Sequence, residues 1–222
     1  MGVLWLVRLL IVVIGSYFLG SFNGAIIISK YLLRNDIRTH GSGNAGLTNF
    51  FRVFGGPLTL VVLLCDVLKA IAAVLLGHFL LCVVDPFTSI GVLSKYIAGL
   101  CCMLGHMYPC MFQFKGGKGV LSSVAAILVI DWRLFLVWIA VFLVSVILTR
   151  WVSLGSILGS VTFAVGTIAL YHNAVLNGWV CLFGLIIGAL IIWRHRENLV
   201  RICQGKENRF SFHKKSDTEG TK

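Results

Sequence analysis

Long runs of hydrophobic residues, separated by short polar segments, occupy most of the chain. A helix needs about 20 mostly apolar residues to cross the hydrocarbon core of a bilayer, with a range of roughly 17 to 25. We therefore predict an all-α, polytopic integral membrane protein with about seven transmembrane helices. The runs that predict them cover residues 4–29, 57–81, 92–112, 119–131, 134–149, 153–172 and 176–193.

The two shortest runs leave the number of helices open. Residues 119–131 and 134–149 are joined only through Asp131, Trp132 and Arg133. The pair forms either a tight helical hairpin or two tilted helices, or else it merges into one span. The merged arrangement would reduce the number of spans from seven to six.

The composition indicates that lipid is the solvent of this chain. Apolar residues make up 58% of it and charged residues only 12%, whereas charged residues form about 25% of an ordinary soluble domain. So few polar side chains cannot cover the surface of a soluble globule. No C-x-x-C pair occurs among the seven cysteines, so we expect neither a metal site nor a redox motif, and no cofactor.

The positive charges predict an orientation in the membrane. If the N-terminus lies outside, fifteen of the nineteen Lys and Arg residues fall on the cytoplasmic side. They lie in residues 30–56 and 113–118, at Arg150, and from Arg194 onward. Because cytoplasmic loops carry the excess of Lys and Arg, we expect an outside N-terminus and a cytoplasmic C-terminus.

No linker divides the chain, so we expect one helical membrane domain over residues 1–210. Residues 211–222 are polar and are expected to form a disordered cytoplasmic tail. The net charge of +11 suits either nucleic acid or an anionic membrane surface. Since the basic tail directly follows an apolar helix, we favour the membrane surface and expect no nucleic-acid partner.

The glycine loop, HGSGNAGLTNFFR (residues 40–52), follows the first hydrophobic run. Its glycines match G-x-G-x-x-G, but a dinucleotide site requires a buried strand before that motif, and no strand pattern precedes it. A flexible connector would explain the glycines but not the polar side chains between them. Backbone amides freed by glycine, hydroxyl and amide groups and the Arg52 guanidinium together suit a phosphate. A helix that begins near Thr48 would add its dipole.

The lysine loop, GHMYPCMFQFKGGKGV (residues 105–120), places two cations beside glycines. It is not a Walker A motif, because Phe112 stands where that motif needs glycine. The loop either only satisfies the positive-inside rule or binds a second phosphate through Lys115, Lys118 and the amides of the glycines between them. The Gly-Gly pair favours phosphate.

The C-terminal cluster, RHRENLVRICQGKEN (residues 194–208), follows the last hydrophobic run. On a continuing helix His195 and Asn198 would share one face. A plain amphipathic end of a helix is the alternative, but topology asks only for positive charge and does not explain His195, Glu197 and Asn198. In the second hydrophobic run, Asp66 and Lys69 form either a structural ion pair or a support for the site. His106 with Pro109 is expected to shape the lysine loop.

All three clusters lie on one predicted side of the membrane. Two phosphate-binding segments beside apolar helices are the arrangement that an enzyme acting on phosphorylated lipids requires. A transporter of a phosphorylated solute is the main alternative, but no inverted repeat is visible and the polar residues avoid the membrane midplane. A scaffold that binds anionic lipid through its basic tail is a second alternative.

Together the clusters resemble the motifs of the acyl-phosphate:glycerol-3-phosphate acyltransferases, the PlsY family of bacterial membranes. The matching stretches are GSGNAGLTNFFR (41–52), GHMYPCMFQFKGGKGV (105–120) and RHRENLVRICQGKE (194–207). The resemblance implies seven spans and an active site facing the cytoplasm of the bacterial inner membrane. It also implies transfer of a fatty acyl group from acyl phosphate to the 1-hydroxyl of glycerol 3-phosphate, which gives lysophosphatidic acid and phosphate, the first step of phospholipid synthesis.

This chain departs from the family pattern at Asn23, Leu47, Leu121 and Ser122, none of which removes a polar donor from the clusters. Acyl phosphate is already activated, so we expect catalysis by positioning and charge neutralisation, with His195 or a substrate phosphate as base. The residues expected to take part are Ser42, Arg52, Lys118 and His195 in catalysis; Gly41, Gly43, Asn44, Gly46, Thr48, Asn49, Lys115, Gly116, Gly117, Gly119, Glu197 and Asn198 in substrate binding; and Asp66, Lys69 and His106 in support.

Overall fold

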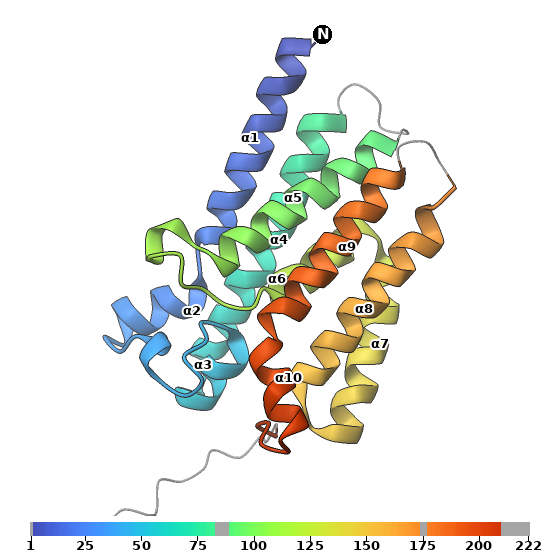
Figure 1. Ribbon diagram of the computed structural model, residues 1–222. Helices are drawn as coiled ribbons and strands as arrows, with labels where there is room; N and C mark the ends of the chain where they lie inside the picture. Colours follow the sequence, from blue (N-terminus) through green and yellow to red (C-terminus); the bar gives the residue numbers. More distant parts are fainter. Residues whose placement is uncertain (1, 83–88, 174–176, 210–222) are drawn as a thin grey trace, which may run out of the picture.

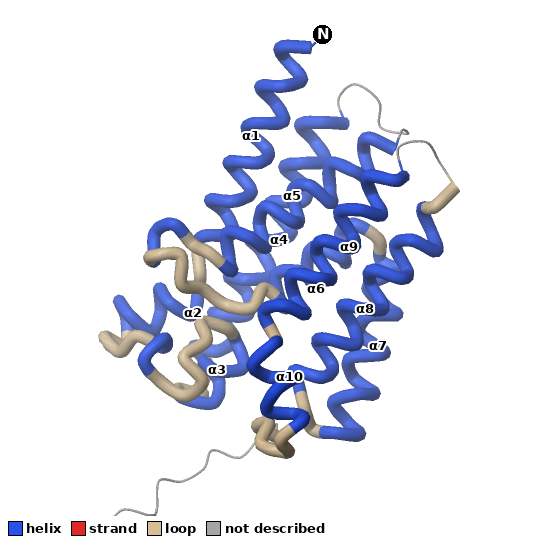
Figure 2. The backbone as a smooth tube through the Cα atoms, viewed as in Figure 1, coloured by secondary structure: helices blue, strands red, loops and turns tan. Residues whose placement is uncertain are grey.

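The computed structural model describes residues 2–82, 89–173 and 177–209, and helices are the regular structure of this part of the chain (Figures 1 and 2). The tail expected at residues 211–222 lies outside the described residues. The elements are α1 (Gly2–Ser21), α2 (Gly24–Ile27), a π-helical turn (Ile28–Leu32), a 3₁₀ turn (Ile37–Thr39), α3 (Leu47–Val53), α4 (Leu58–Leu81), α5 (Ser89–Met107), a second 3₁₀ turn (Cys110–Phe112), α6 (Val120–Ile130), α7 (Trp132–Thr149), α8 (Val152–Tyr171), α9 (Asn177–Arg194) and α10 (Arg196–Cys203).

Each predicted hydrophobic run contains a helix, which confirms the all-α membrane architecture. Five helices of the described chain are long and apolar enough to cross a membrane, or six if α9 and α10, bent by 54°, form one span. With 11 residues, α6 is about 17 Å long at 1.5 Å per residue, shorter than a hydrocarbon core of about 30 Å. The count of seven spans and the outside N-terminus stay predictions.

The break between α6 and α7 shows that residues 119–149 do not form one continuous helix. Asp131 has extended backbone and its side chain accepts a hydrogen bond from the Arg133 amide at 2.9 Å, which caps α7. The same carboxylate pairs with the Arg133 guanidinium at 2.7 Å and accepts from the Tyr171 hydroxyl at 2.7 Å. A merged helix is therefore wrong, because Asp131 ends one helix and begins the next.

The first predicted span is one candidate span over residues 2–32, but its helix contains a break. Asn23 separates α1 from α2, and its side chain accepts a hydrogen bond from the Ile26 amide at 3.0 Å. Its amide group donates to the carbonyl of Ala45 at 3.1 Å. A side chain that caps one helix and binds a distant loop thus replaces the continuous helix expected over residues 4–29.

Small residues allow close packing between the helices around α5. A Cβ added to Gly20 of α1 would lie 2.0 Å from the Cys102 carbonyl oxygen, and one added to Gly105 would lie 2.1 Å from the Tyr17 carbonyl oxygen. Only glycine permits these backbones to approach so closely. The largest buried core of the described residues joins α4, α5, α6, α7, α8 and α9.

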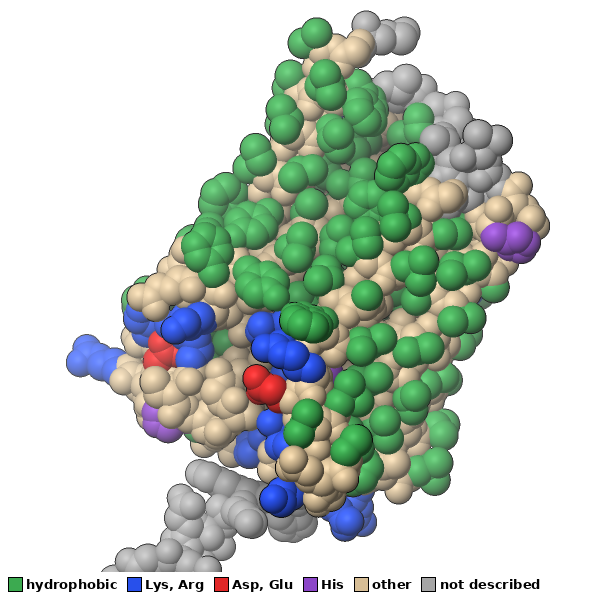
Figure 3. Space-filling model, viewed as in Figure 1, with side chains coloured by type: hydrophobic (Ala, Val, Ile, Leu, Met, Phe, Trp, Pro, Cys, Tyr) green, Lys and Arg blue, Asp and Glu red, His purple; other side chains and the backbone are tan. Residues whose placement is uncertain are grey.

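The outer surface separates apolar from charged side chains. Hydrophobic side chains cover most of the visible face, while Lys and Arg gather at the end where α2, α3 and α10 lie (Figure 3). On α7, Ile147 and Leu148 are 75% and 78% exposed, which is the exposure expected of a lipid-facing surface. The polar end is where the site lies.

Candidate functional site

One cavity of about 330 Å³ reaches all three clusters. The glycine loop, the lysine loop and the C-terminal cluster each contribute side chains to its wall, so the predicted convergence is confirmed. Apolar residues of α6, α7 and α8 complete it. The residues that line it are Ser42, Asn44, Gly46, Leu47, Thr48, Asn49, Arg52, Asp66, His106, Lys118, Gly119, Val120, Leu121, Val124, Trp138, Ile139, Phe142, Val152, Ser153, Ser156, His195, Asn198, Arg201, Glu207 and Asn208.

The buried side chain of Asn49 organises the glycine loop. Its oxygen accepts a hydrogen bond from the Ser42 amide, and its nitrogen donates to the carbonyls of His40 and Asn44, each at 3.0 Å. The loop needs glycine at 41 and 43, where φ is +58° and +69°. Neither Gly41 nor Gly43 lines the cavity, so the structure gives these two and Asn49 a place in the loop framework.

Four other polar side chains of the glycine loop form part of the cavity wall. Ser42, Asn44, Thr48 and Arg52 line it, and Ser42 and Arg52 are exposed. α3 begins at Leu47, one residue before the helix start expected from the sequence. The beginning of this helix therefore lies at the cavity, next to a guanidinium group.

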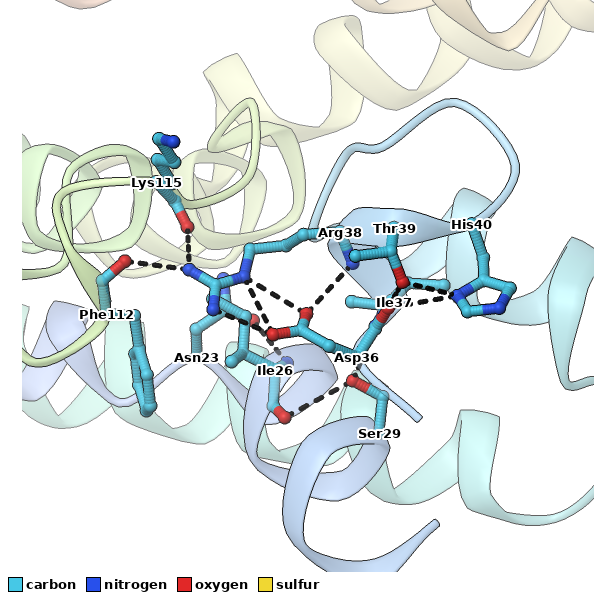
Figure 4. A network of polar contacts seen from close by, with 10 residues as sticks. All are labelled: Asn23, Ile26, Ser29, Asp36, Ile37, Arg38, Thr39, His40, Phe112 and Lys115. Atoms are coloured by element: carbon cyan, nitrogen blue, oxygen red, sulfur yellow. Dashed lines mark hydrogen bonds and ion pairs between the residues drawn. The ribbon is translucent and has the colours of Figure 1, made fainter. Parts of the chain in front are cut away.

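Hydrogen bonds from Arg38, two residues before the glycine loop, fasten this part of the chain to the lysine loop (Figure 4). Arg38 binds Asp36 at 2.7 Å, and its guanidinium also donates to the carbonyl oxygens of Phe112 at 2.8 Å and Lys115 at 3.4 Å. The hydrogen bond from Arg38 holds the pKa of Asp36 below its ordinary value. Lys115 is exposed and does not line the cavity; what it supplies here is a backbone carbonyl.

The two glycines between the lysines close the end of α5. The amide of Gly116 donates to the carbonyl of Met107 and that of Gly117 to the carbonyl of His106, both at 3.1 Å. The sequence predicted that these two amides bind phosphate. In the structure they instead donate hydrogen bonds to the carbonyls at the end of α5, which have no partner within the helix. A Cβ at Gly117 would lie 2.2 Å from the His106 ring, so glycine is required for packing.

Lys118 is the lysine that reaches the cavity. Its ammonium donates a hydrogen bond to the side-chain oxygen of Asn198 in α10. Burial, together with the nearby charge of Arg201, lowers the pKa of Lys118 to about 8. The next residue, Gly119, has φ of +77° and precedes α6, so the chain turns sharply from the cation into an apolar helix.

A buried group of charged residues lies behind the lysine loop. The Lys69 ammonium is 2.6 Å from Asp66 Oδ1, 3.0 Å from His106 Nδ1 and 2.8 Å from the carbonyl oxygen of Phe22. Asp66, Lys69 and His106 are each less than 10% exposed. Asp66 and His106 line the cavity whereas Lys69 does not. The ion pair expected in α4 therefore exists, and it contacts the histidine against which Gly117 packs.

His195 occupies the bend between α9 and α10 and lines the cavity. Its Nδ1 lies 2.8 Å from the carbonyl oxygen of Ile191. A carbonyl only accepts hydrogen bonds, so Nδ1 carries the proton and Nε2 of the neutral ring keeps its lone pair. This is the tautomer that a general base requires.

The sequence missed Glu207 and named Glu197 instead. Glu197 is exposed and does not line the cavity. The Glu207 carboxylate accepts hydrogen bonds from Asn198 at 2.7 Å, Ser153 at 2.8 Å and Arg201 at 2.9 Å. Burial raises the pKa of Glu207, but these hydrogen bonds outweigh it and hold the pKa below its ordinary value.

Arg194 also had no predicted role in the site and was counted only among the positive charges that predict the orientation in the membrane. Its guanidinium donates to the carbonyl oxygen of Gly117 at 2.9 Å and lies over the Tyr108 ring, 5.3 Å from the ring centre. It thus joins the end of α9 to the lysine loop. The glycine loop, the lysine loop and the C-terminal cluster each supply cationic residues at or beside the cavity: Arg52, Lys118, Arg194 and Arg201.

Residues 10–205 match the family model described as glycerol-3-phosphate acyltransferase. The glycerol-3-phosphate acyltransferase of Thermoanaerobacter pseudethanolicus is 38% identical over 194 residues, which cover 87% of this chain and 91% of the relative. That of Clostridioides difficile is 36% identical over 200 residues, with coverage of 90% and 94%.

Two solved structures share the fold over 91% of this chain. Both are crystal structures of PlsY, described as an integral membrane glycerol 3-phosphate acyltransferase. The glycerol 3-phosphate form has a TM-score of 0.78 and 35% identity and is covered over 96% of its length. The lysophosphatidic acid form has a TM-score of 0.74 and 34% identity, with 95% covered.

Proposed function

The chain belongs to the glycerol-3-phosphate acyltransferase family, and from this premise we propose that its acyl donor is acyl phosphate. The reaction acylates the 1-hydroxyl of glycerol 3-phosphate and gives lysophosphatidic acid and inorganic phosphate. The enzyme is a multi-pass membrane protein. The excess of cations in the polar segments supports a site that faces the cytoplasm at the bacterial inner membrane.

One observation carries the proposal: a single cavity is lined by both cationic and apolar side chains. Arg52, Lys118 and Arg201 line it together with Leu121 and Phe142. Both the donor and the lipid product join a phosphate group to a fatty chain. A site for such molecules needs donors for the phosphate and an apolar wall for the chain, in contact with each other.

The reaction itself requires little covalent help from the protein. The 1-hydroxyl oxygen attacks the acyl carbon, a new ester bond forms, and the bond from that carbon to the phosphate oxygen breaks. The electron pair of the broken bond leaves with phosphate, where Lys118 and Arg52 would neutralise the developing charge. Because the donor is a mixed anhydride, no acyl-enzyme is needed, and Ser42 would serve as a hydrogen-bond donor.

His195 is the side chain best suited to accept the proton of the attacking hydroxyl. Its Nδ1 faces the Ile191 carbonyl, which leaves Nε2 free to act as base. Asn198, fixed between Lys118 and Glu207, would orient glycerol 3-phosphate beside it. His195→Gln should therefore lower kcat by about a hundredfold or more with a smaller change in KM.

The test of the donor uses purified protein, glycerol 3-phosphate and either acyl phosphate or acyl-coenzyme A of the same chain length. We expect lysophosphatidic acid from acyl phosphate alone, and background amounts from a Lys118→Ala variant. Equal or greater product from acyl-coenzyme A would contradict the proposed donor while leaving the family membership untouched.

A further inference from the structure

α7 and α8 lie side by side (Figure 1) and are held in register by glycines of α8. A Cβ at Gly155 would lie 3.0 Å from the Phe142 side chain, and one at Gly159 would lie 2.6 Å from the Trp138 indole. Farther along, a Cβ at Gly166 would lie 2.7 Å from Leu134. The residue numbers rise on α8 as they fall on α7, so the two helices are antiparallel. The three contacts therefore mark successive depths along the helix pair, measured from the polar end of the protein.

Along α7 and α8 the cavity ends at the depth of Trp138. Phe142 and Trp138 of α7 line it, whereas Leu134, one turn deeper, does not. On α8 the deepest lining residue is Ser156, one turn before Gly159. On α6, which leads away from Lys118, the last lining residue is Val124. Among the lining side chains Trp138 is the deepest on α7.

The Trp138 indole is held in place by packing contacts. It stacks on Phe142 with ring centres 5.1 Å apart and an angle of 15°, and it is 2% exposed. It also packs against Gly159. Within the described chain its Nε1 has no hydrogen-bond partner. Because the indole lines the cavity, a smaller residue would leave its volume open to the cavity, and no hydrogen bond would be lost.

We propose that Trp138 limits the length of the acyl chain that the enzyme accepts. The inference rests on the proposed function, since it takes the apolar part of the cavity wall, formed by α6 and α7, as the acyl site. Up to the indole, each buried methylene should raise kcat/KM roughly fourfold. Beyond it, further methylenes find no space and the gain should stop or reverse.

The experiment compares kcat/KM for saturated acyl phosphates of increasing chain length in the wild type, Trp138→Ala and Trp138→Phe. Trp132→Ala is the matched control, because Trp132 lies on the same helix, is 62% exposed and does not line the cavity. We expect Trp138→Ala to move the optimum to longer donors by about two methylenes or more, with about a tenfold gain for the longest donor relative to the shortest. Trp138→Phe should shift the optimum in the same direction but less, and Trp132→Ala should keep the wild-type profile.

Identical profiles in the wild type and both Trp138 variants would overturn the inference, as would an equal shift in Trp132→Ala. If Trp138→Ala does not fold, the Trp138→Phe profile decides. These results differ from failure of the proposed function, in which the wild type would form no lysophosphatidic acid from any acyl phosphate.

Discussion

The Lys118 ammonium donates a hydrogen bond to the side-chain oxygen of Asn198, which lies 80 positions later in the chain. The nitrogen of the same amide donates to Glu207 at 2.7 Å. A cation of the lysine loop is thus held in place by an amide of α10, and that amide by a carboxylate. This chain of contacts links the lysine loop to the C-terminal cluster.

Lys118 and Lys115 provide a matched pair of substitutions. Lys118→Ala removes a cation from the cavity wall and should lower kcat/KM by about a hundredfold or more. Lys115→Ala changes an exposed side chain outside the cavity and should change it less than about threefold. Rates of lysophosphatidic acid formation by both proteins check this. A similar loss in both variants would argue for a general effect of loop charge.

The charge of Lys118 should also shape the pH profile. A lysine is cationic below its pKa, and that of Lys118 is lowered to about 8. Raising the pH through that value therefore removes the charge, and kcat/KM should fall about tenfold per pH unit above it. Bound phosphate would stabilise the ammonium, so the decline should be weaker in kcat. A Lys118→Arg variant should lack this decline, because guanidinium stays protonated.

Glu207 and Glu197 form a second matched pair. Glu207→Gln keeps the size of the side chain but removes its negative charge. That charge strengthens the hydrogen bonds that the carboxylate accepts from Asn198, Ser153 and Arg201. Charge-assisted hydrogen bonds contribute about 1.5–3 kcal/mol each, so we expect KM for glycerol 3-phosphate to rise about tenfold or more. Glu197→Gln, at an exposed position, should behave as wild type. Steady-state kinetics checks both, and an unchanged KM in Glu207→Gln would contradict an organising role.

The contrast between these glutamates shows what sequence could predict here. Hydrophobic runs determine where apolar helices form, and the three polar clusters could be expected to meet because they share one side of the membrane. Which acidic residue joins the three clusters could not be predicted. Glu207 is held there by a hydrogen bond from Ser153 on α8, and α8 carries no polar motif. The amides of Gly116 and Gly117 were misjudged for a different reason, because the lysine loop folds back on the end of α5 and its residue pattern does not reveal that turn. Trp138 resembled any other apolar residue of a spanning helix.

Gly117 should be intolerant of a methyl group. A Cβ there would lie 2.2 Å from His106 Nε2 and 2.8 Å from the Ala45 carbonyl oxygen. Gly117→Ala must displace the buried histidine or the glycine loop, so we expect a loss of about 1–3 kcal/mol in stability and of most activity. Gly178→Ala, where nothing lies within 4 Å of the added methyl, should be neutral. Thermal unfolding in detergent compares the two, and equal stability would mean that the lysine loop can shift freely.

The buried pair of Asp66 and Lys69 tests whether charge is needed for stability or for catalysis. Their charged atoms are 2.6 Å apart and nearly inaccessible, so removing one partner leaves the other buried and uncompensated. Asp66→Asn and Lys69→Met should each cost about 3–5 kcal/mol, whereas the double variant should recover most of that loss. Chemical unfolding of the four proteins gives the coupling free energy directly.

Activity of the double variant then separates the two roles left open for this pair. His106 contacts both charged residues and supports Gly117. If the pair only stabilises the fold, the stable double variant should turn over substrate at a rate near that of wild type. If it positions His106 and the lysine loop, kcat/KM should stay reduced about tenfold or more while stability is restored. Additive losses without recovery would show that the ion pair does not couple the two residues at all.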